Sequence, residues 1–503
     1  MTRAVIIGID GLDADLLRVY GPSLPHLRRL MLESPFLELT SSFPPETRST
    51  WASIYTGLNP GNHGVLDTGS YSQQAAQETS PKLKIPHGET FWDIAGHAGK
   101  RVCVVNPLLA YPAWQVNGVM VSLPPTGING CGPSFIPEDV APVEPFPSLL
   151  NSTQIPTYRQ LKEFSSSLYT LTLQQVERAK ELFRREPWDI FFIQLDALDY
   201  IQHVFWRYSD PGDPAYPGRN KHAERILDFY RLFDVIVGQF RAFLEQDCVL
   251  LVVSGHGHGR SCTQCFNLNE WLREQKLLTA HLRSMRLLNR RYMLERARQH
   301  SFELLTQLHL QDVMPHMSQY FSSRQIESYT SCLIDQQATL AQVVELVGSS
   351  PFGGIILNRT RIEQCGETYE HIRATLMRKL AQLRLKGRPV VHWVKERESI
   401  YQGKYSQFYP DILFELRPDL GVDSSIYVPL TTESLVHPMI SGNHRMHGIL
   451  LLGNLPVERQ VLDNVKEPDV MDVAPTILSI IDATGPDRDG KALILPCTTT
   501  LMT

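Results

Sequence analysis

Residues 251–260 read LVVSGHGHGR, and this stretch indicates both a type of fold and the position of a site. The apolar run that ends at Ser254 is typical of a strand buried on both faces, as the strands of a parallel sheet are. It leads directly into the pentapeptide GHGHG of residues 255–259, so a buried strand delivers two histidines to a glycine-rich turn. The stretch therefore raises two questions: what these histidines bind, and why a glycine separates the strand from the first of them.

The rest of the chain repeats this succession of strand and helix. Five segments read as strands, several of them continuous apolar runs: Ala4–Ile9, Arg101–Asn106, Asp189–Leu195, Val249–Ser254 and Gly448–Leu452. Apolar residues recur at helical spacing in Leu173–Arg185 and Ala223–Leu244. Strands that alternate with helices predict an α/β fold, a three-layer sandwich in which helices cover both faces of a mainly parallel sheet.

The pattern changes between residues 268 and 390. The sequence there is long, charged and rich in helix-forming residues, as in NEWLREQKLL (269–278) and NRRYMLERARQHSFELLTQLHL (289–310). We expect a helix-rich inserted cap over 268–390, with the core formed by 1–267 and 391–503.

Composition limits the partners that the chain can have. Its 503 residues are 43% hydrophobic and 20% charged, which is ordinary globular composition. The formal charge of −5 is spread without a basic block, so a nucleic-acid polymer is not an expected partner. No apolar run approaches the roughly 20 residues of a membrane helix, and the start MTRAVIIGIDG reads as a first strand rather than a signal peptide. These features predict a cytoplasmic protein without a membrane partner.

Potential metal ligands lie at the ends of the predicted strands. Asp10 ends the first strand, and Asp199 and His203 follow the third at a spacing of four, which places them on one face of a helical turn. His256 follows the fourth strand, and His444 precedes the last. Each residue alone has an ordinary explanation, such as a turn or cap role for Asp10. Together they suit zinc, manganese or a similar ion at one edge of the sheet.

Six segments, taken in order, resemble a known group of enzymes. They are GIDGLD (8–13), FPPETRSTWASIYTGLNPGNHGV (43–65), DALDYIQHVFWRY (196–208), VVSGHGHG (252–259), SGNHRMHG (441–448) and DVMDVAPTILSII (469–481). Their order and spacing resemble the alkaline phosphatase superfamily, and within it the type I phosphodiesterase and nucleotide pyrophosphatase branch. The resemblance covers most of the chain outside the expected insertion.

The resemblance implies one or two divalent metal ions per chain, most simply zinc, with manganese as the alternative. Position by position, it implies Asp199, His203 and His444 as ligands of one ion and Asp10, Thr47 and His256 as ligands of the other. Thr47 also matches the nucleophile, and Thr50 falls where a residue that contacts the phosphate is expected.

The implied chemistry explains these residue types. A threonine hydroxyl is a poor nucleophile at neutral pH, and coordination to a divalent cation lowers its pKa. The resemblance thus implies hydrolysis of a small phosphate ester, such as a phosphodiester or nucleotide pyrophosphate, through a phosphothreonine at Thr47. Superfamily relatives also act on monoesters and sulfate esters or transfer phosphoryl groups.

One position departs from the family pattern. The family has an aspartate ligand before the histidine of this motif, where the chain has Gly255, which offers no side-chain donor. A water, a substrate oxygen or His258 could fill the vacancy; the chain could be a specialised one-metal tailoring or transfer enzyme; or it could bind a phosphorylated ligand or partner without catalysis. We expect Gly255→Asp to raise metal affinity.

Two further features have alternative readings. Cys262 and Cys265 could combine with His258 in a separate zinc site, but four good ligands are not visible, and ordinary buried or loop cysteines are the simpler interpretation. His447 reads as a surface histidine or as a contact near the site. The sequence predicts neither the natural substrate nor the oligomeric state.

Overall fold

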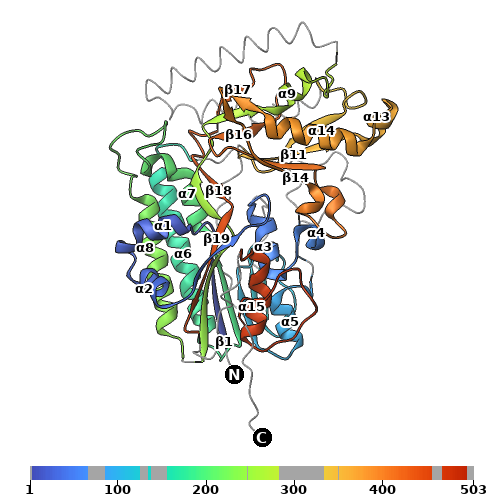
Figure 1. Ribbon diagram of the computed structural model, residues 1–503. Coiled ribbons are helices and arrows are strands. Elements are labelled where there is room, and N and C mark those ends of the chain that lie inside the picture. Colours follow the sequence, from blue (N-terminus) through green and yellow to red (C-terminus); the bar gives the residue numbers. More distant parts are fainter. Residues whose placement is uncertain are drawn as a thin grey trace.

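A mainly parallel sheet of eight strands forms the centre of the protein (Figure 1). The computed structural model describes residues 3–65, 85, 87–124, 134–137, 156–245, 247–281, 333–348, 350–434, 436–455 and 467–494. In sheet order the strands are β2 (Phe36–Thr40), β19 (His447–Gly453), β7 (Cys248–Ser254), β1 (Arg3–Ile9), β6 (Ile190–Leu195), β3 (Val102–Val105), β4 (Gly118–Ser122) and β5 (Ser134–Ile136). The strands from β7 to β4 run parallel, whereas β19 and β5 are antiparallel to their neighbours.

Helices cover both faces of this sheet because successive side chains of a strand point to opposite faces. In β1, Val5, Ile7 and Ile9 belong to one core cluster, whereas Ala4 and Ile6 belong to the other. The first cluster is covered by α1 (Ala14–Tyr20), α2 (Pro25–Glu33), α6 (Leu161–Phe183), α7 (Ala197–Ser209) and α8 (Arg225–Ala242). The second is covered by α3 (Thr47–Thr56), α5 (Phe91–His97) and α15 (Val473–Ile480). The predicted three-layer α/β fold is therefore confirmed.

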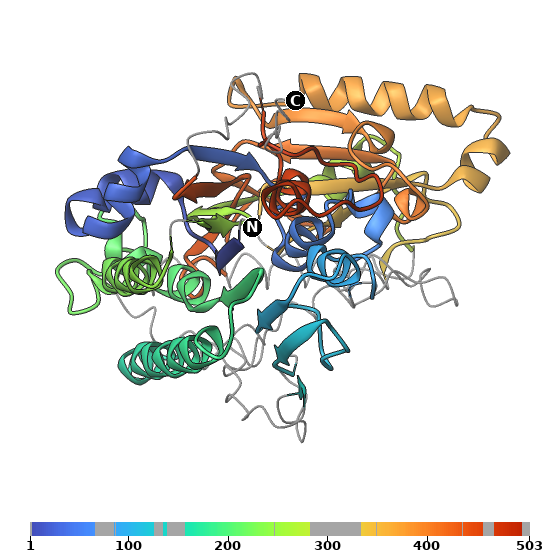
Figure 2. The same ribbon diagram turned by 90° about the horizontal axis from the view of Figure 1, so that it is seen from below.

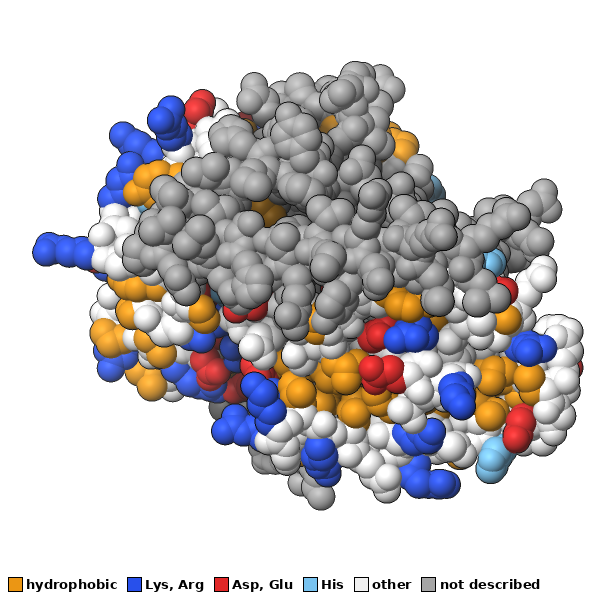
Figure 3. Space-filling view, turned by 90° about the horizontal axis from the view of Figure 1, so that it is seen from above, with side chains coloured by type: hydrophobic (Ala, Val, Ile, Leu, Met, Phe, Trp, Pro, Cys, Tyr) orange, Lys and Arg blue, Asp and Glu red, His pale blue; other side chains and the backbone are white. Residues whose placement is uncertain are grey.

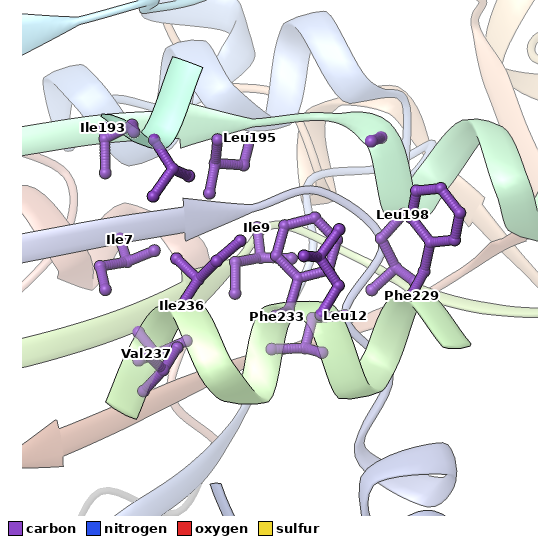
Figure 4. Packing of buried hydrophobic residues seen from close by; sticks show 14 of the residues in the cluster. Ile7, Ile9, Leu12, Ile193, Leu195, Leu198, Phe229, Phe233, Ile236 and Val237 are labelled. Atoms are coloured by element: carbon purple, nitrogen blue, oxygen red, sulfur yellow. The ribbon is translucent and has the colours of Figure 1, made fainter. Parts of the chain in front are cut away.

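The packing between β1 and α8 illustrates the first core. Figure 4 shows Ile7 and Ile9 of β1 facing Phe233 and Ile236 of α8, and all four side chains are at most 1% exposed. At roughly 25 cal/mol per Å² of apolar surface removed from water, such residues stabilise the fold by about 1.5–3 kcal/mol each. This packing fixes the central strands, whose carboxyl ends carry the candidate site.

The strands and helices named from the sequence are present, with small differences at their ends. Each of the five predicted strands matches an observed strand within two residues at either end. Helix α6 begins at Leu161, twelve residues before the predicted start at Leu173. Its first turns bury Leu161, Phe164 and Leu168, but serines between the last two weaken the apolar pattern in the sequence.

A second unit has its own sheet and core (Figure 1). Its strands, in sheet order, are β10 (Ala341–Glu345), β11 (Phe352–Leu357), β15 (Ile412–Leu416) and β14 (Val391–Glu396), and its helices include α9 (Leu268–Glu274), α13 (Arg359–Gln364) and α14 (Tyr369–Gln382). Figure 2 shows α14 running alongside this sheet. Because β14 and β15 follow residue 390 yet pair with β11, directly or through one another, we propose a later boundary for the insertion than 390. Residues 282–332 of the expected helical cap lie outside the described residues.

Two small sheets are formed by strands that lie between β7 and β19 in the chain. One joins β16 (Leu420–Asp423), β9 (Gln264–Asn267) and β17 (Thr431–Glu433). The other is a two-stranded ribbon of β8 (Gly257–Arg260) and β18 (Gly442–Arg445). Residues 257–259 of the GHGHG segment thus belong to a strand pair, and Gly255 and His256 form the short connection between β7 and β8.

The described surface is mixed in charge. On the described part of the face in Figure 3, Lys and Arg side chains are interspersed with Asp, Glu and apolar side chains. Among the described helices, none combines the length and the apolar character that crossing a bilayer would require.

Candidate metal centre

Three adjacent strands bring the first candidate ligands together. In the sheet, β1 lies between β6 and β7 and runs parallel to both, so the carboxyl ends of all three meet at one edge. Asp10 follows β1, Asp199 lies in the first turn of α7 after β6, and His256 follows β7. Their ligand atoms all lie within 4.8 Å of one another, and all three residues are buried.

Helix α3 adds a hydroxyl to this group. Thr47 is the first residue of α3, whose N-cap Glu46 accepts a hydrogen bond from the backbone NH of Ser49. Thr47 Oγ1 lies 3.1 Å from His256 Nε2, which is 3.2 Å from Asp10 Oδ1. We call Asp10, Thr47 and His256 the threonine-side group.

Asp10 also has a partner that the sequence did not identify. The indole Nε1 of Trp51, one turn along α3 from Thr47, donates a hydrogen bond of 2.9 Å to Asp10 Oδ1. The side chain of Trp51 is fully buried, so this contact fixes the orientation of the carboxylate. Only the spacing of four between Thr47 and Trp51 could have suggested it.

A second group surrounds Asp199. His203 is one turn further along α7, with its Nε2 3.4 Å from Asp199 Oδ2. His444 comes from β18, and its Nε2 lies 3.3 Å from Asp199 Oδ1 and 2.9 Å from His203 Nε2. The sequence predicted that these three residues meet, and they do.

Backbone carbonyls orient the imidazoles of this centre. His203 Nδ1 donates to the carbonyl of Gly442 at 2.8 Å, and His444 Nδ1 donates to the carbonyl of Pro45 at 2.7 Å. With Nδ1 protonated, each neutral ring presents the lone pair of Nε2 to the centre. Two such lone pairs 2.9 Å apart repel each other unless a cation or a proton lies between them.

His258 belongs to the Asp199 group. In the ribbon, β18 and β8 pair antiparallel with His444 directly opposite His258, so both side chains point the same way. His258 Nε2 lies 3.5 Å from Asp199 Oδ1, and the ring meets that of His203 edge to face. The sequence offered His258 for the vacancy at Gly255 or for a cysteine site, whereas the structure places it among Asp199, His203 and His444. We call these four residues the ribbon-side group.

The donor spacing of both groups fits a divalent cation. Bonds of 2.0–2.1 Å to a tetrahedral ion place its ligand atoms about 3.3 Å apart. Six donor pairs in these groups lie 2.9–3.5 Å apart, and the carboxylate and imidazole ligand atoms of each group all lie within 4.8 Å of one another. Asp199 Oδ1 and both ring nitrogens of His258 are buried without a hydrogen-bond partner, which a bound cation would compensate.

The protonation states agree with this assignment. Burial opposes ionisation of Asp199, but His203 and His444 outweigh it and hold the pKa of the carboxyl well below its usual value. Burial lowers the pKa of His258 far below the usual value, which keeps the ring neutral. Burial also acts on His256, but Asp10 outweighs it and raises the pKa to about 9. Burial opposes protonation of His203 in the same way, but Asp199 outweighs it and raises the pKa of that ring as well. A cation that enters either group must therefore compete with a proton, on His256 in one and on His203 in the other.

Packing explains why residue 255 is a glycine here. A Cβ at Gly255 would lie 2.5 Å from Cγ2 of Thr50 and 3.2 Å from Cδ1 of Ile54. Thr50 is fully buried, and its hydroxyl makes hydrogen bonds with Ser42 (2.7 Å) and Ser41 (3.2 Å). The Thr50 methyl group therefore fills the space beside the backbone of residue 255. Contact of Thr50 with a substrate stays a prediction.

The cysteines lie apart from both groups. Cys262 and Cys265 are buried and free, and Cys262 Sγ donates to the carbonyl of Pro418 at 3.6 Å. Burial raises the pKa of Cys262 to about 12, so its reactive thiolate form is suppressed. Among the described residues, neither cysteine belongs to a group that could hold a metal ion, and His447 is exposed.

Comparison with solved structures supports the same fold. Phosphonoacetate hydrolase from Sinorhizobium meliloti 1021, solved with phosphonoformate, is similar over 96% of this chain and 95% of its own, with a TM-score of 0.54 and 14% identity. Murine ectonucleotide pyrophosphatase/phosphodiesterase 5 is similar over 97% of both chains, with a TM-score of 0.50 and 13% identity. At such identities the likeness is one of fold.

Family membership rests on sequence. A search of curated protein sequences gave no match. The family model "Type I phosphodiesterase / nucleotide pyrophosphatase" matches residues 4–447, which include every residue of both donor groups. The chain therefore belongs to the type I phosphodiesterase and nucleotide pyrophosphatase family, within the alkaline phosphatase superfamily.

Proposed function

We propose that this chain is a divalent-cation-dependent phosphoester hydrolase in which Thr47 is the nucleophile. The observation that carries the proposal is the position of the Thr47 hydroxyl. It stands at the first residue of α3, 3.1 Å from His256 Nε2, which in turn lies 3.2 Å from the buried carboxylate of Asp10. Family membership supports the reaction class.

Each residue has a role that follows from its place. Thr47 Oγ would form a bond to phosphorus as the leaving oxygen departs, and water would then hydrolyse the phosphothreonine. Asp10 and His256 would hold one cation beside Thr47, and Asp199, His203 and His444 would hold the other. Bound there, a divalent cation would lower the pKa of the Thr47 hydroxyl and offset the charge of the phosphoryl group.

The missing aspartate at residue 255 has a possible replacement in Asp199. This residue belongs to both potential metal groups, so one carboxylate could supply an anionic donor to each. This arrangement favours the reading in which both cation positions function. The specialised one-metal reading is the second candidate, and the Thr50 methyl that fills the space beside Gly255 favours it.

Donor chemistry favours zinc. Imidazole and carboxylate ligands gathered at a largely buried site suit Zn²⁺, and manganese prefers sites richer in oxygen. A small phosphate ester, and first a phosphodiester, is the substrate class that we would test.

Thr47→Ala and Thr47→Ser test the proposal. Turnover of chromogenic phosphodiester, monoester and sulfate ester substrates would be measured with zinc or manganese. We expect a loss of at least about 10³-fold in Thr47→Ala, because a nucleophile is removed, and partial activity in Thr47→Ser, because a hydroxyl remains. Mass spectrometry of acid-quenched wild type should show phosphate on the peptide that contains Thr47. Undiminished activity in Thr47→Ala would refute the nucleophile assignment.

A further inference from the structure

We propose that His258 is a fourth protein ligand of the cation held by Asp199, His203 and His444, so that this position keeps its ion more tightly than the threonine-side position does. The inference rests on the proposed function and extends it to the unequal loading of the two positions.

The geometry of the ribbon places His258 as a donor. His258 and His444 lie opposite each other on β8 and β18, and both approach Asp199 Oδ1, at 3.5 and 3.3 Å. The four ligand atoms of the ribbon-side group lie within 4.8 Å of one another. Three of these separations, 2.9 Å between His203 and His444 and 3.3 and 3.5 Å from Asp199 Oδ1 to His444 and His258, are close to the roughly 3.3 Å edge of a tetrahedron with ligand bonds of 2.0–2.1 Å.

His258 has no other partner for its ring nitrogens. It is 2% exposed, and neither Nδ1 nor Nε2 makes a hydrogen bond within the described structure. An unsatisfied polar group in such a place is costly, and native proteins rarely leave one. A cation bound through Nε2 would provide the missing interaction of that nitrogen.

The surrounding chain is shaped to hold this ring in place. A Cβ at Gly442 would lie 2.7 Å from Cε1 of His258 and 2.2 Å from the carbonyl oxygen of Gln202, so only glycine permits the close approach of β18. The backbone NH of His258 donates to Oδ2 of Asp13, and Trp206 stacks on the imidazole. These contacts fix both the backbone and the ring plane of His258.

The two positions therefore differ in donor strength. The ribbon-side group offers three imidazoles and a carboxylate, which is a complete four-coordinate set. The threonine-side group offers one imidazole, one carboxylate and a neutral hydroxyl. The carboxylate of Asp199 lies near both positions, so it is not a ligand of this position alone. We expect the ribbon-side ion to be resident and the threonine-side ion to exchange readily.

Cobalt binding and thermal unfolding of His258→Ala test this inference in the full chain. Protein stripped with a chelator would be titrated with Co²⁺, read by its visible absorption, and with Zn²⁺, read as the rise in Tm above each variant's own metal-free Tm. Loss of a residue that only orients a ligand weakens metal binding by about 10–100-fold, so loss of a direct ligand should weaken the tight site by about 100-fold or more. The intense four-coordinate cobalt absorption should also be lost as water replaces the ring.

Three further variants make the result interpretable. His447→Ala removes an exposed histidine and should bind like wild type, and His444→Ala should lose the tight ion. His258→Asn keeps a polar side chain for the case in which alanine unfolds the ribbon, and it should show the same weakened binding. Wild-type affinity and absorption in folded His258→Ala or His258→Asn, with binding lost in His444→Ala, would overturn the inference alone. Unchanged binding in His444→Ala as well would overturn the proposed metal site itself.

Discussion

The two donor groups share Asp199 but are built on different parts of the fold. The threonine-side group stands on the ends of β1 and β7 and the start of α3, where Trp51 orients Asp10. The ribbon-side group combines α7 with a strand pair that supplies two facing histidines. Gly255 removes a carboxylate from the first, and His258 adds an imidazole to the second. The two positions therefore differ in the number of imidazole and carboxylate ligands that the chain offers to each.

Asp199→Asn should have the largest effect on metal binding, because the carboxylate of Asp199 lies in both donor groups. We expect metal content to fall at both positions and phosphoester turnover to drop by at least about 10³-fold, since a buried anionic donor is replaced by an amide. Metal analysis after dialysis and initial rates would be measured. The matched control is Asp234→Asn, a buried aspartate outside both groups whose Oδ1 accepts from the NH of Leu27, a bond that asparagine can keep. Retention of one tight ion in Asp199→Asn would show that Asp199 is not shared.

Gly255→Asp should raise the metal affinity of the threonine-side group only when a second substitution makes room for the new side chain. From the sequence, this substitution alone is expected to raise metal affinity, but its Cβ would lie 2.5 Å from the Thr50 methyl. With that methyl in place we instead expect destabilisation of about 1–3 kcal/mol and no gain in metal affinity. Thr50→Ser removes that methyl and keeps the hydroxyl that bonds Ser41 and Ser42.

The double variant Gly255→Asp/Thr50→Ser should therefore bind the threonine-side ion roughly tenfold more tightly or better, as expected for a new anionic donor. Denaturant unfolding and zinc titration of the wild type, both single variants and the double variant would be compared. A gain in affinity by Gly255→Asp alone would mean that the backbone adapts without the methyl being removed.

Trp51→Phe should give the smallest and most selective effect. It deletes the indole NH that donates to Asp10 and keeps most of the buried ring. We expect the threonine-side affinity to fall about tenfold, as for partners that orient a ligand, and the ribbon-side affinity to stay the same. If zinc titration showed that both affinities fall together, the substitution would have disturbed the positions of the ligands in both groups.

The sequence predicts the core of this fold well because its strands are continuous apolar runs. It also predicts the meeting of Asp10, Asp199 and His256, since parallel neighbours end at one edge. The sheet of the second unit is harder to predict, because β11 pairs with β15, a strand that lies more than 50 residues later in the chain and beyond residue 390.

The positions of His258 and Thr50 required the structure. His258 joins the ribbon-side group only because β8 pairs with β18 in a register that no local pattern specifies. Similarly, the space beside Gly255 is filled by a residue 205 positions earlier in the chain, Thr50. Both relations depend on contacts between distant segments, which periodicity and motif spacing do not encode.

Calorimetric titration with zinc of metal-free wild type, His444→Ala and Asp10→Asn would show whether the two cation positions differ in affinity. Two unequal sites should appear in the wild type, with the tight one lost in His444→Ala and the weak one lost in Asp10→Asn. Two equal sites in the wild type, or a single site that survives both substitutions, would contradict the account.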